Sequence, residues 1–431
     1  MAQNNVEEKE ITPIELPSSK YIILVGDGMG DFPLEQLDGK TPLEYARTPA
    51  MDRLTKLGEL GTVKTIPDGF QPGSDVANMS LMGYDPAKFY TGRGPLEAAA
   101  MGVQMNPEDV AFRCNMVTLA FREGRIMMID YSAGHISNEE AQILLNDLKP
   151  LVNARSFDLV PGVSYRHLLL WRGGPEGLAT VPPHDFTGMD VTEAWHVYEE
   201  EPLLYDLLTK AITLFHRHPV NEKRKQEGKN PANALWPWGQ GRRPVMATFQ
   251  QLYDIDGAVI AAVDLIRGLG AWAGLERIDV PGATGFLDTN YRGKAEAALK
   301  ALKDKQLVFL HVEAPDEASH MGDLSAKIKA IERFDREVVS VIMDGLREMG
   351  GSYRILLTTD HFTPIKMRTH APMPVPFAIY DNMNPQDNDH NNTFCEKAAE
   401  KAPIHIDKGY MLMQRFIGVE PREVELNPKK K

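Results

Sequence analysis

Residues 21–31, YIILVGDGMGD, decide the fold of this chain. The run YIILV is apolar at every position, a pattern typical of a β-strand that helices cover on both faces of a parallel sheet. This strand pattern stops abruptly at a glycine-rich turn that carries Asp27. Ligands of such sheets bind at the carboxyl edge of the strands, so we expect the functional site to include this turn.

The same alternation of helix and buried strand returns near the C-terminus. The helical pattern KAEAALKALKDK precedes QLVFLHVEAPDEASH, and the helical pattern IKAIERFDREVVSVIMDGLREM precedes YRILLTTDHF. In both units the acidic residues follow the apolar strand. Together with residues 21–31, these units predict an α/β fold in which helices lie on both sides of a mostly parallel sheet.

The middle of the chain has a different pattern. It holds short strand-like pieces (FRCNMVTLAF, RIMMIDY and YRHLLLW), two amphipathic helices, and a segment rich in Gly, Pro and Trp, PANALWPWGQGRRP. A chain of 431 residues is also too long for one ordinary core. We therefore expect one domain from residues 19–105 and 247–431, an inserted smaller α/β domain from residues 106–246, and a flexible tail at residues 1–18.

The formal net charge of −13 excludes some classes of partner. Nucleic acid and anionic membranes are bound by basic faces, so neither is expected as a partner. A small anionic substrate remains compatible with the negative net charge, because bound metal ions can reverse the sign of the charge locally. The longest apolar stretches have the length of strands, which predicts no transmembrane segment, and the acidic N-terminus predicts no signal peptide. Cys114 and Cys395 match no metal-ligand spacing, so we expect reduced thiols and a cytoplasmic location.

The turn GDGMGD differs from the dinucleotide-binding fingerprint. Its glycines are spaced GxGxG, and the carboxylate of Asp27 would repel a pyrophosphate. A carboxylate at the tip of a central strand, flanked by glycines that let other groups approach, suits a hard cation. The alternative is a tight turn between strand and helix in which Asp27 acts as a cap.

Three further clusters of acid and imidazole follow apolar strands. Asp360 and His361 come directly after a strand, Asp316 and His320 are spaced to share one face of a starting helix, and His370 lies on a proline-fixed loop. Taken singly, each histidine has an ordinary alternative as a cap or core residue. Because all the clusters fall at one edge of the sheet, we interpret them as metal ligands, and their chemistry suits Mn2+, Zn2+ or Fe better than Ca2+.

Ser74, in GSDVANMSLMG, follows Pro-Gly and opens an amphipathic helix. Backbone amides at a helix start attract an anion, and a nearby metal would lower the pKa of the hydroxyl enough to make it a nucleophile. The alternative is a helix N-cap, for which Ser is one of the commonest residues.

These motifs, in this order, resemble the alkaline phosphatase superfamily and more closely the archaeal-type cofactor-independent phosphoglycerate mutases. The likeness runs from about Tyr21 to beyond Phe377. The strings that carry it are GDGMGD, GSDVANMSLMGYDP, YTGRGPLEA, PPHDFTG, WPWGQG, EAPDEASH, TTDH and RTHAPMPVPF. The resemblance implies an alkaline-phosphatase-like sandwich of helices around the sheet, with the inserted domain acting as a closing lid.

The resemblance also implies two divalent metal ions, with Mn2+ favoured and Mg2+, Zn2+ or Co2+ as alternatives. The ligands of one ion would be Asp27, Ser74, Asp360 and His361, and those of the other Asp316, His320 and His370. Members of the family form a phosphoserine and return the phosphoryl group to the other hydroxyl of glycerate. The expected activity is therefore the interconversion of 3-phosphoglycerate and 2-phosphoglycerate without bisphosphoglycerate.

Five residues resemble the family's substrate side. They are His135 in SAGHIS, Arg166 in SYRHL, His184 and Asp185 in PPHDFTG, and Arg267 in AVDLIRGLG. Asp185 is the candidate general acid or base for the glycerate hydroxyls, and the guanidinium of Arg166 suits a carboxylate or phosphate. We expect many relatives to carry Lys in place of Arg267, and the two cations are not equivalent.

The residues leave several functions open. The same metal site suits a homoserine kinase-like phosphotransferase or a phosphate-ester hydrolase. The metal ligands do not distinguish between phosphoryl donors and acceptors, so we expect the inserted domain to determine which of them bind. A noncatalytic metal-binding or anion-binding module is the alternative from another class. A small phosphorylated substrate is the expected partner, and the oligomeric state does not follow from the sequence.

Overall fold

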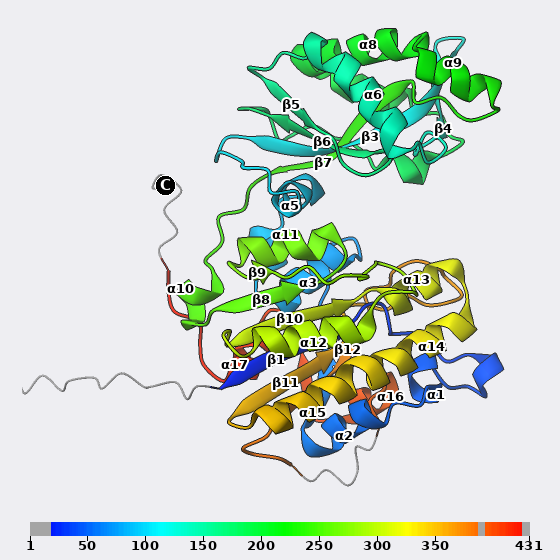
Figure 1. Ribbon diagram of the computed structural model, residues 1–431. Helices are drawn as coiled ribbons and strands as arrows, with labels where there is room; N and C mark the ends of the chain where they lie inside the picture. Colours follow the sequence, from blue (N-terminus) through cyan, green and yellow to red (C-terminus); the bar gives the residue numbers. More distant parts are fainter. Residues whose placement is uncertain (1–18, 387–392, 425–431) are drawn as a thin grey trace, which may run out of the picture.

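The computed structural model describes residues 19–386 and 393–424, so the tail expected at residues 1–18 lies outside the described part. The chain forms two separate β-sheets, each with its own covering helices (Figure 1). None of the helices in the described part is long and apolar enough to cross a membrane.

The larger sheet has eight strands in the order β13-β2-β12-β11-β1-β10-β8-β9. Strand β1 pairs in parallel with β10 and β11, while β12 runs antiparallel to both of its neighbours. This arrangement confirms the mostly parallel sheet. The bounds of the strands are β1 Lys20–Gly26, β2 Glu59–Val63, β8 Gly257–Ile260, β9 Glu276–Arg277, β10 Leu307–Val312, β11 Tyr353–Thr358, β12 Val375–Asp381 and β13 Ile404–Ile406.

Hydrophobic cores lie on both faces of this sheet, which explains why YIILV is apolar throughout. Ile22 and Leu24 belong to one core, and Tyr21, Ile23 and Val25 belong to the other. The helices that contribute to the first core include α2 Pro49–Leu57, α12 Tyr291–Ala301, α14 Leu324–Phe334, α15 Ser340–Met349 and α16 Glu396–Lys401. Those that contribute to the second include α3 Ser74–Leu81, α10 Phe249–Tyr253, α11 Asp264–Trp272 and α17 Met411–Ile417.

The smaller sheet is antiparallel and is built from the middle of the chain. Its strands are β3 Val110–Arg122, β4 Arg125–Asp130, β5 Phe157–Val160, β6 Arg166–Trp171 and β7 Ala234–Arg242. Its core is shared with α6 Asn138–Leu148, α7 Thr192–His196, α8 Pro202–His216 and α9 Pro219–Gln226. Helix α5 Arg93–Ala100 lies between the two sheets and contacts both α11 and β3 (Figure 1). We keep the division into domains at residues 106 and 246 as a proposal.

Strand β7 is formed by the segment that is rich in Gly, Pro and Trp. Trp236 and Trp238 are buried there. Pro237 fits because, among the described strands, β7 pairs with β3 alone, so one side of β7 carries no ladder that needs a backbone N–H. Its carbonyl oxygen accepts a hydrogen bond from the Tyr198 hydroxyl at 2.6 Å. Burial of Trp236 and Trp238 and the hydrogen bond from Tyr198 therefore stabilise this segment as a strand.

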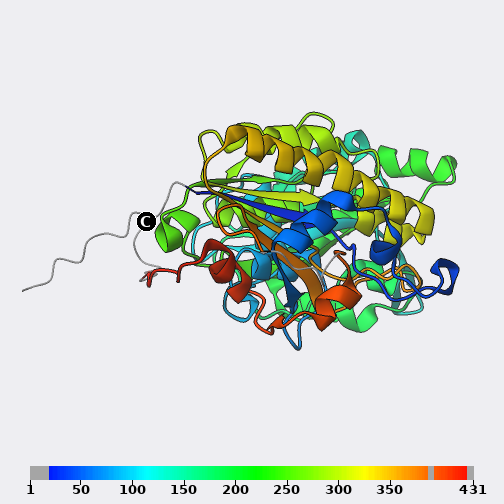
Figure 2. The same ribbon diagram turned by 90° about the horizontal axis from the view of Figure 1, so that it is seen from below.

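The long helical pattern after β10 is interrupted by a π-helical segment at Asp335–Val339, between α14 and α15. Figure 2 shows this gold helix running across the sheet. The Asp335 carboxylate accepts hydrogen bonds from the backbone N–H of Met51 at 2.7 Å and of Ala50 at 3.3 Å. The segment therefore anchors the start of α2, a role that side-chain periodicity alone does not reveal.

A buried ion pair ties together two loops at the carboxyl edge of the large sheet. Lys327 Nζ donates to Asp31 Oδ2 at 2.9 Å and to the carbonyl oxygens of Thr363 at 2.9 Å and Gly30 at 3.3 Å. Both side chains of the pair are almost completely buried. Lys327 therefore fixes the turn after β1 against the segment after β11.

Replacing Lys327 by Met is expected to lower the free energy of unfolding by about 3–5 kcal/mol, because it leaves the buried Asp31 carboxylate without its counter-charge. Urea denaturation measures the change. The exposed Lys329 on the same helix provides the matched control, and Lys329→Met should change the free energy by less than about 0.5 kcal/mol. Equal effects of the two substitutions would contradict the assigned role of the pair.

Candidate active site

The candidate ligands meet at the carboxyl edge of the large sheet. Asp27 directly follows β1, and Asp360 and His361 lie just beyond β11. Helix α13, Ala314–Met321, begins after β10 and carries Asp316 and His320. Because β11, β1 and β10 are neighbours in the sheet, their ends bring side chains from three distant segments to one place.

Asp27, Asp360 and His361 form one group of candidate metal ligands. One ligand atom of each lies within 4.8 Å of the others, and all three residues are buried. His361 Nε2 is 3.4 Å from Asp27 Oδ1 and 3.5 Å from Asp360 Oδ2. Ser74 joins the group because its Oγ lies 3.0 Å from His361 Nε2.

The Ser74 hydroxyl does not cap its helix. Helix α3 begins at Ser74, its N-cap residue is Gly73, and no side chain forms a hydrogen bond at this cap. One turn later, Asn78 Nδ2 donates to Ser74 O and to Asp360 Oδ2, each at 2.8 Å. The Ser74 hydroxyl is thus available for chemistry. The sequence analysis missed Asn78, although a spacing of four residues places it on the same helix face as Ser74.

Asp316, His320 and His370 form a second group, and their ligand atoms also lie within 4.8 Å of one another. Asp316 Oδ2 is 3.1 Å from His320 Nε2, and Asp316 Oδ1 is 3.4 Å from His370 Nε2. The two Nε2 atoms are 3.0 Å apart. The structure thus brings all seven predicted ligands into two adjacent groups.

Hydrogen bonds at Nδ1 orient the imidazoles of the second group. His320 Nδ1 lies 2.9 Å from Arg368 O, and His370 Nδ1 lies 3.3 Å from Pro72 O. A carbonyl oxygen only accepts, so both Nδ1 atoms carry hydrogen and, in the neutral rings, each Nε2 presents a lone pair. Two lone pairs that face each other at 3.0 Å repel unless a positive charge lies near both.

Thr363 links the two groups. Its Oγ1 donates to Asp316 Oδ1 at 2.5 Å and lies 3.1 Å from His361 Nδ1. Because the hydroxyl has one hydrogen and gives it to Asp316, His361 Nδ1 must be the donor to Thr363. His361 Nε2 therefore presents its lone pair toward Ser74. No pattern in the sequence had singled out Thr363.

Unpaired atoms show that divalent cations fit these groups. Asp27 Oδ1 is buried and has no hydrogen-bond partner among the described residues, an arrangement that costs free energy unless a positive charge compensates. In the second group, Asp316 and the Nε2 atoms of His320 and His370 converge, and an ion would take the place of the proton that His320 holds. Carboxylate, imidazole and hydroxyl groups together suit ions such as Mn2+ and Zn2+.

Crowding moves the pKa values of the three acids in different directions. Burial, followed by the charges of Asp360 and Asp316, raises the pKa of Asp27 well above its usual range. Burial also opposes ionisation of Asp360 and Asp316, but neighbouring histidines outweigh it and lower the pKa of both. Of these three carboxylates, Asp27 therefore receives the least compensation of its negative charge from the surrounding side chains.

Gly28 allows the turn after β1 to approach the second group. Its φ is +61°, in the left-handed region that favours glycine, and a Cβ at this position would lie 2.6 Å from Asp316 Oδ1 and from Thr363 Oγ1. Any larger residue would push the two groups apart. This contact fits the expectation that glycines here let other groups come close.

A cavity of about 820 Å³ extends from the candidate ligands toward the smaller sheet. Asp27, Ser74, Asp316 and His370 line one part, and Arg166 on β6 lines another. Arg166 is thus the predicted substrate-side residue that the structure places beside the ligands.

Two arginines that the sequence analysis missed, Arg93 and Arg113, also line the cavity. Arg93 Nε lies 3.1 Å from Asp75 Oδ2, and Arg113 Nε lies 2.8 Å from Glu97 Oε1. A charged residue within the apolar strand pattern FRCNMV was the available signal for Arg113. Three guanidinium groups beside the ligands suit an anionic substrate.

His135, His184 and Asp185 are not among the described residues that line the cavity. The rings of His135 and His184 both contact Tyr131, with centroids 6.3 and 6.2 Å from it. Asp185 Oδ1 lies 3.6 Å from His184 Nε2. His135 has a φ of +47°, a conformation that is uncommon for residues other than glycine and recurs at functional sites.

Arg267 on α11 is held by acids. Its guanidinium lies 2.5 Å from Asp279 Oδ1 and 3.7 Å from Asp264 Oδ1. Asp264 lines the cavity, but Arg267 itself is not among the lining residues of the described part. Contact with an anion in the cavity would require Arg267 to exchange these partners.

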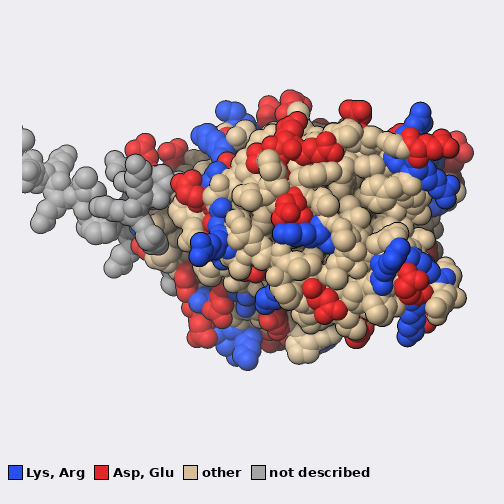
Figure 3. Space-filling view, turned by 90° about the horizontal axis from the view of Figure 1, so that it is seen from above, with Lys and Arg blue, Asp and Glu red and all other residues tan. Residues whose placement is uncertain are grey.

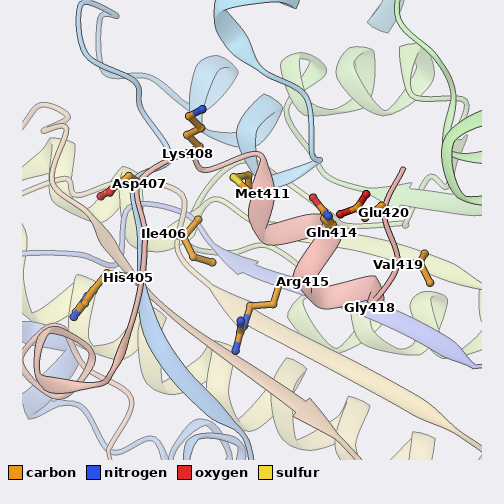
Figure 4. A pocket seen from close by; sticks show the side chains of 10 residues that line it. All are labelled: His405, Ile406, Asp407, Lys408, Met411, Gln414, Arg415, Gly418, Val419 and Glu420. Atoms are coloured by element: carbon orange, nitrogen blue, oxygen red, sulfur yellow. The ribbon is translucent and has the colours of Figure 1, made fainter. Parts of the chain in front are cut away.

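Two other surfaces of the described part do not show this convergence of ligands. A hollow of about 640 Å³ between β13 and α17 is lined by His405, Lys408, Arg415 and neighbouring residues, whose side chains do not point to a common centre (Figure 4). On the face that carries α8 and α9, basic and acidic side chains are interspersed (Figure 3). The candidate active site is therefore the edge formed by β11, β1 and β10.

Comparisons with known proteins identify the family. A family model described as 2,3-bisphosphoglycerate-independent phosphoglycerate mutase matches residues 55–221. A probable enzyme of this name from Geobacter sulfurreducens is 48% identical over 92% of this chain and 99% of its own length. The chain belongs to this family. A mutase of the same name from Methanosarcina barkeri is 50% identical over 90% of this chain and 97% of its own length.

Solved structures agree with this membership. A protein from Pyrococcus horikoshii is similar with a TM-score of 0.79 and 30% identity, over 94% of this chain and 99% of its own. The cofactor-independent phosphoglycerate mutase from Thermoplasma acidophilum has a TM-score of 0.64 and 26% identity, over 93% and 99%. The resemblance to the archaeal-type mutases and the expected α/β fold are both confirmed.

The affinity of the metal-free protein for a divalent ion is expected to rise with pH. Hydrogen bonding with Asp316 raises the pKa of His320 to about 9. Below that pH an ion at the second group must displace the His320 proton, so affinity should increase up to about tenfold per pH unit and level off near pH 9. Calorimetric titration with Mn2+ between pH 6.5 and 8.5, in buffers of different ionisation enthalpy, measures affinity and proton release.

The same pKa shift fixes the sign of a stability change. Because the folded pKa of His320 is raised, its pairing with Asp316 stabilises the metal-free protein fully below about pH 6.5 and is lost as pH rises through about 9. The variant Asp316→Asn should lose this pH-dependent part of the stability. Ion binding without proton release would contradict the assignment.

Proposed function

We propose that this protein interconverts 3-phosphoglycerate and 2-phosphoglycerate by phosphoryl transfer through Ser74. The observation that carries the proposal is the Ser74 hydroxyl, which does not cap its helix and lies 3.0 Å from His361 Nε2 beside the buried carboxylates of Asp27 and Asp360. Membership of the phosphoglycerate mutase family supports the choice of substrate.

We propose two bound divalent ions, with Mn2+ favoured. The first would be held by Asp27, Ser74, Asp360 and His361, and the second by Asp316, His320 and His370. When bound, such ions would lower the pKa of the Ser74 hydroxyl and offset the charge of the phosphate. The donor set of each group supports this proposal without selecting the metal used in the cell.

The transfer needs two displacements at phosphorus. In the first, Ser74 Oγ forms a bond to phosphorus as the bond to one glycerate oxygen breaks. In the second, the other glycerate hydroxyl forms a bond to phosphorus as the bond to Ser74 Oγ breaks. We assign Asp185 to the exchange of protons with the glycerate hydroxyls, and Arg166, with His135, His184 and Arg267, to binding of glycerate and phosphate.

Retention of glycerate between the two steps requires exclusion of water. The smaller sheet stands over the cavity and contributes Arg166 to its wall, so we propose that residues 106–246 close over the substrate. Closure would also bring His135, His184 and Asp185 toward the cavity. We place the protein in the cytoplasm, which fits the two free, buried cysteines.

Purified protein with Mn2+ is expected to convert 3-phosphoglycerate to 2-phosphoglycerate, and enolase coupled to the product measures the rate. Phosphate release from 3-phosphoglycerate without isomerisation would instead identify a hydrolase. ATP-dependent phosphorylation of homoserine with no mutase signal would identify the kinase-like alternative. Either result would overturn the proposed substrate while leaving the metal ligands in place.

The variant Ser74→Ala is expected to lose about 10⁴-fold or more in kcat, because no other group supplies the nucleophile. Mn2+ binding should persist, since the carboxylates and imidazoles remain. Ser80→Ala is the matched control: Ser80 is buried on the same helix and its hydroxyl has no hydrogen-bond partner in the described part. Full turnover by Ser74→Ala would rule out Ser74 as the nucleophile.

A further inference from the structure

His311, near the end of β10, is a fully buried imidazole beside the first group of ligands. Its Nε2 lies 3.5 Å from Asp27 Oδ2 and 3.6 Å from Asp360 Oδ2. Its Nδ1 lies 3.5 Å from Glu313 Oε1. Both ring nitrogens are therefore directed at carboxylate oxygens, although neither contact is as short as a hydrogen bond.

Glu313 is held firmly on the far side of this imidazole. Its Oε2 accepts a hydrogen bond from Lys294 Nζ at 2.6 Å, and its Oε1 accepts from the backbone N–H of Ala262 at 2.7 Å and Val263 at 3.2 Å. Lys294 also donates to the carbonyl oxygen of His311 at 2.9 Å. These hydrogen bonds fix the position of the Glu313 carboxylate that faces Nδ1 of the imidazole.

The two carboxylates in front of His311 differ in their support. Asp360 Oδ1 accepts from the backbone N–H of Gly28 and His361, and its Oδ2 accepts from Asn78. In the described part of the chain, Oδ1 of Asp27 has no hydrogen-bond partner. Asp27 is thus the ligand whose orientation depends most on the charged groups around it, and His311 faces its Oδ2 while His361 faces its Oδ1.

We propose that His311 is a positioning residue for the first metal site, which holds Oδ2 of Asp27 through Nε2 and thereby directs Oδ1 toward the cation. Glu313 anchors the ring through Nδ1, and His311 itself lies outside the group of ligand atoms. The inference rests on the proposed use of metal at this site. A histidine that merely fills buried space would show no dependence on a donor at either ring nitrogen.

The test compares three substitutions at His311 by their Mn2+ affinity in the metal-free protein. Gln places an amide N–H near the position of Nε2, Asn places one near Nδ1, and Leu provides neither. Titrations in a His320→Ala background report the first site, and titrations in a His361→Ala background report the second. Loss of an outer partner of a metal ligand typically weakens binding by about 10–100-fold.

We expect His311→Leu and His311→Asn to weaken binding about 10–100-fold at the first site and less than about threefold at the second. His311→Gln should stay within about fivefold of the parent at the first site. Equal affinities of the Gln and Asn variants, or equal losses at both sites, would overturn the inference.

Mn2+ binding by the proteins that retain His311 separates failure of the proposed metal site from failure of the role assigned to His311. If the chain with His311 intact binds no Mn2+, the proposed function fails together with its metal site. If it binds Mn2+ and the Asn and Gln variants bind alike, only the role of His311 fails. Should His311→Leu not fold, Asn and Gln are both polar amides and their comparison alone decides.

Discussion

Mutual repulsion among buried carboxylates is the constraint on which the rest of this structure depends. The sheet order β11-β1-β10 places Asp360, Asp27 and Asp316 at one edge, almost entirely removed from water. Such a cluster is stable only if positive charge and donors are supplied locally. The histidines provide part of the compensation, and the unpaired Asp27 Oδ1 marks where a bound cation would provide the remainder.

Most of the large sheet could be predicted from sequence, because uninterrupted apolar runs such as YIILV have few structural solutions once both faces must be covered. Two features of the local structure could not be predicted from the sequence. Strand β7 accommodates Pro237 because one of its sides is unpaired among the described strands, while Trp236 and Trp238 are buried, and the π-helical segment around Asp335 contacts α2. Both are decided by tertiary packing, which periodicity does not encode.

The candidate ligands were accessible from sequence because acids and imidazoles directly after parallel strands necessarily share an edge. Asn78, Thr363 and His311 were missed, since each lies against the ligands through side-chain contacts that only the folded structure reveals. The substrate side was harder still. Arg93 and Arg113 reach the cavity, whereas His135 and His184 do not line it, because that placement depends on the packing between two sheets.

The hydroxyl of Thr363 connects the two groups of ligands through two hydrogen bonds. Its hydrogen is committed to Asp316, and its oxygen receives the hydrogen of His361. A change of charge on either side alters the strength of the bond on the other, since linked hydrogen bonds polarise one another. Loading of the two proposed sites would therefore be thermodynamically coupled, and by reciprocity each ion would change the affinity for the other by the same factor.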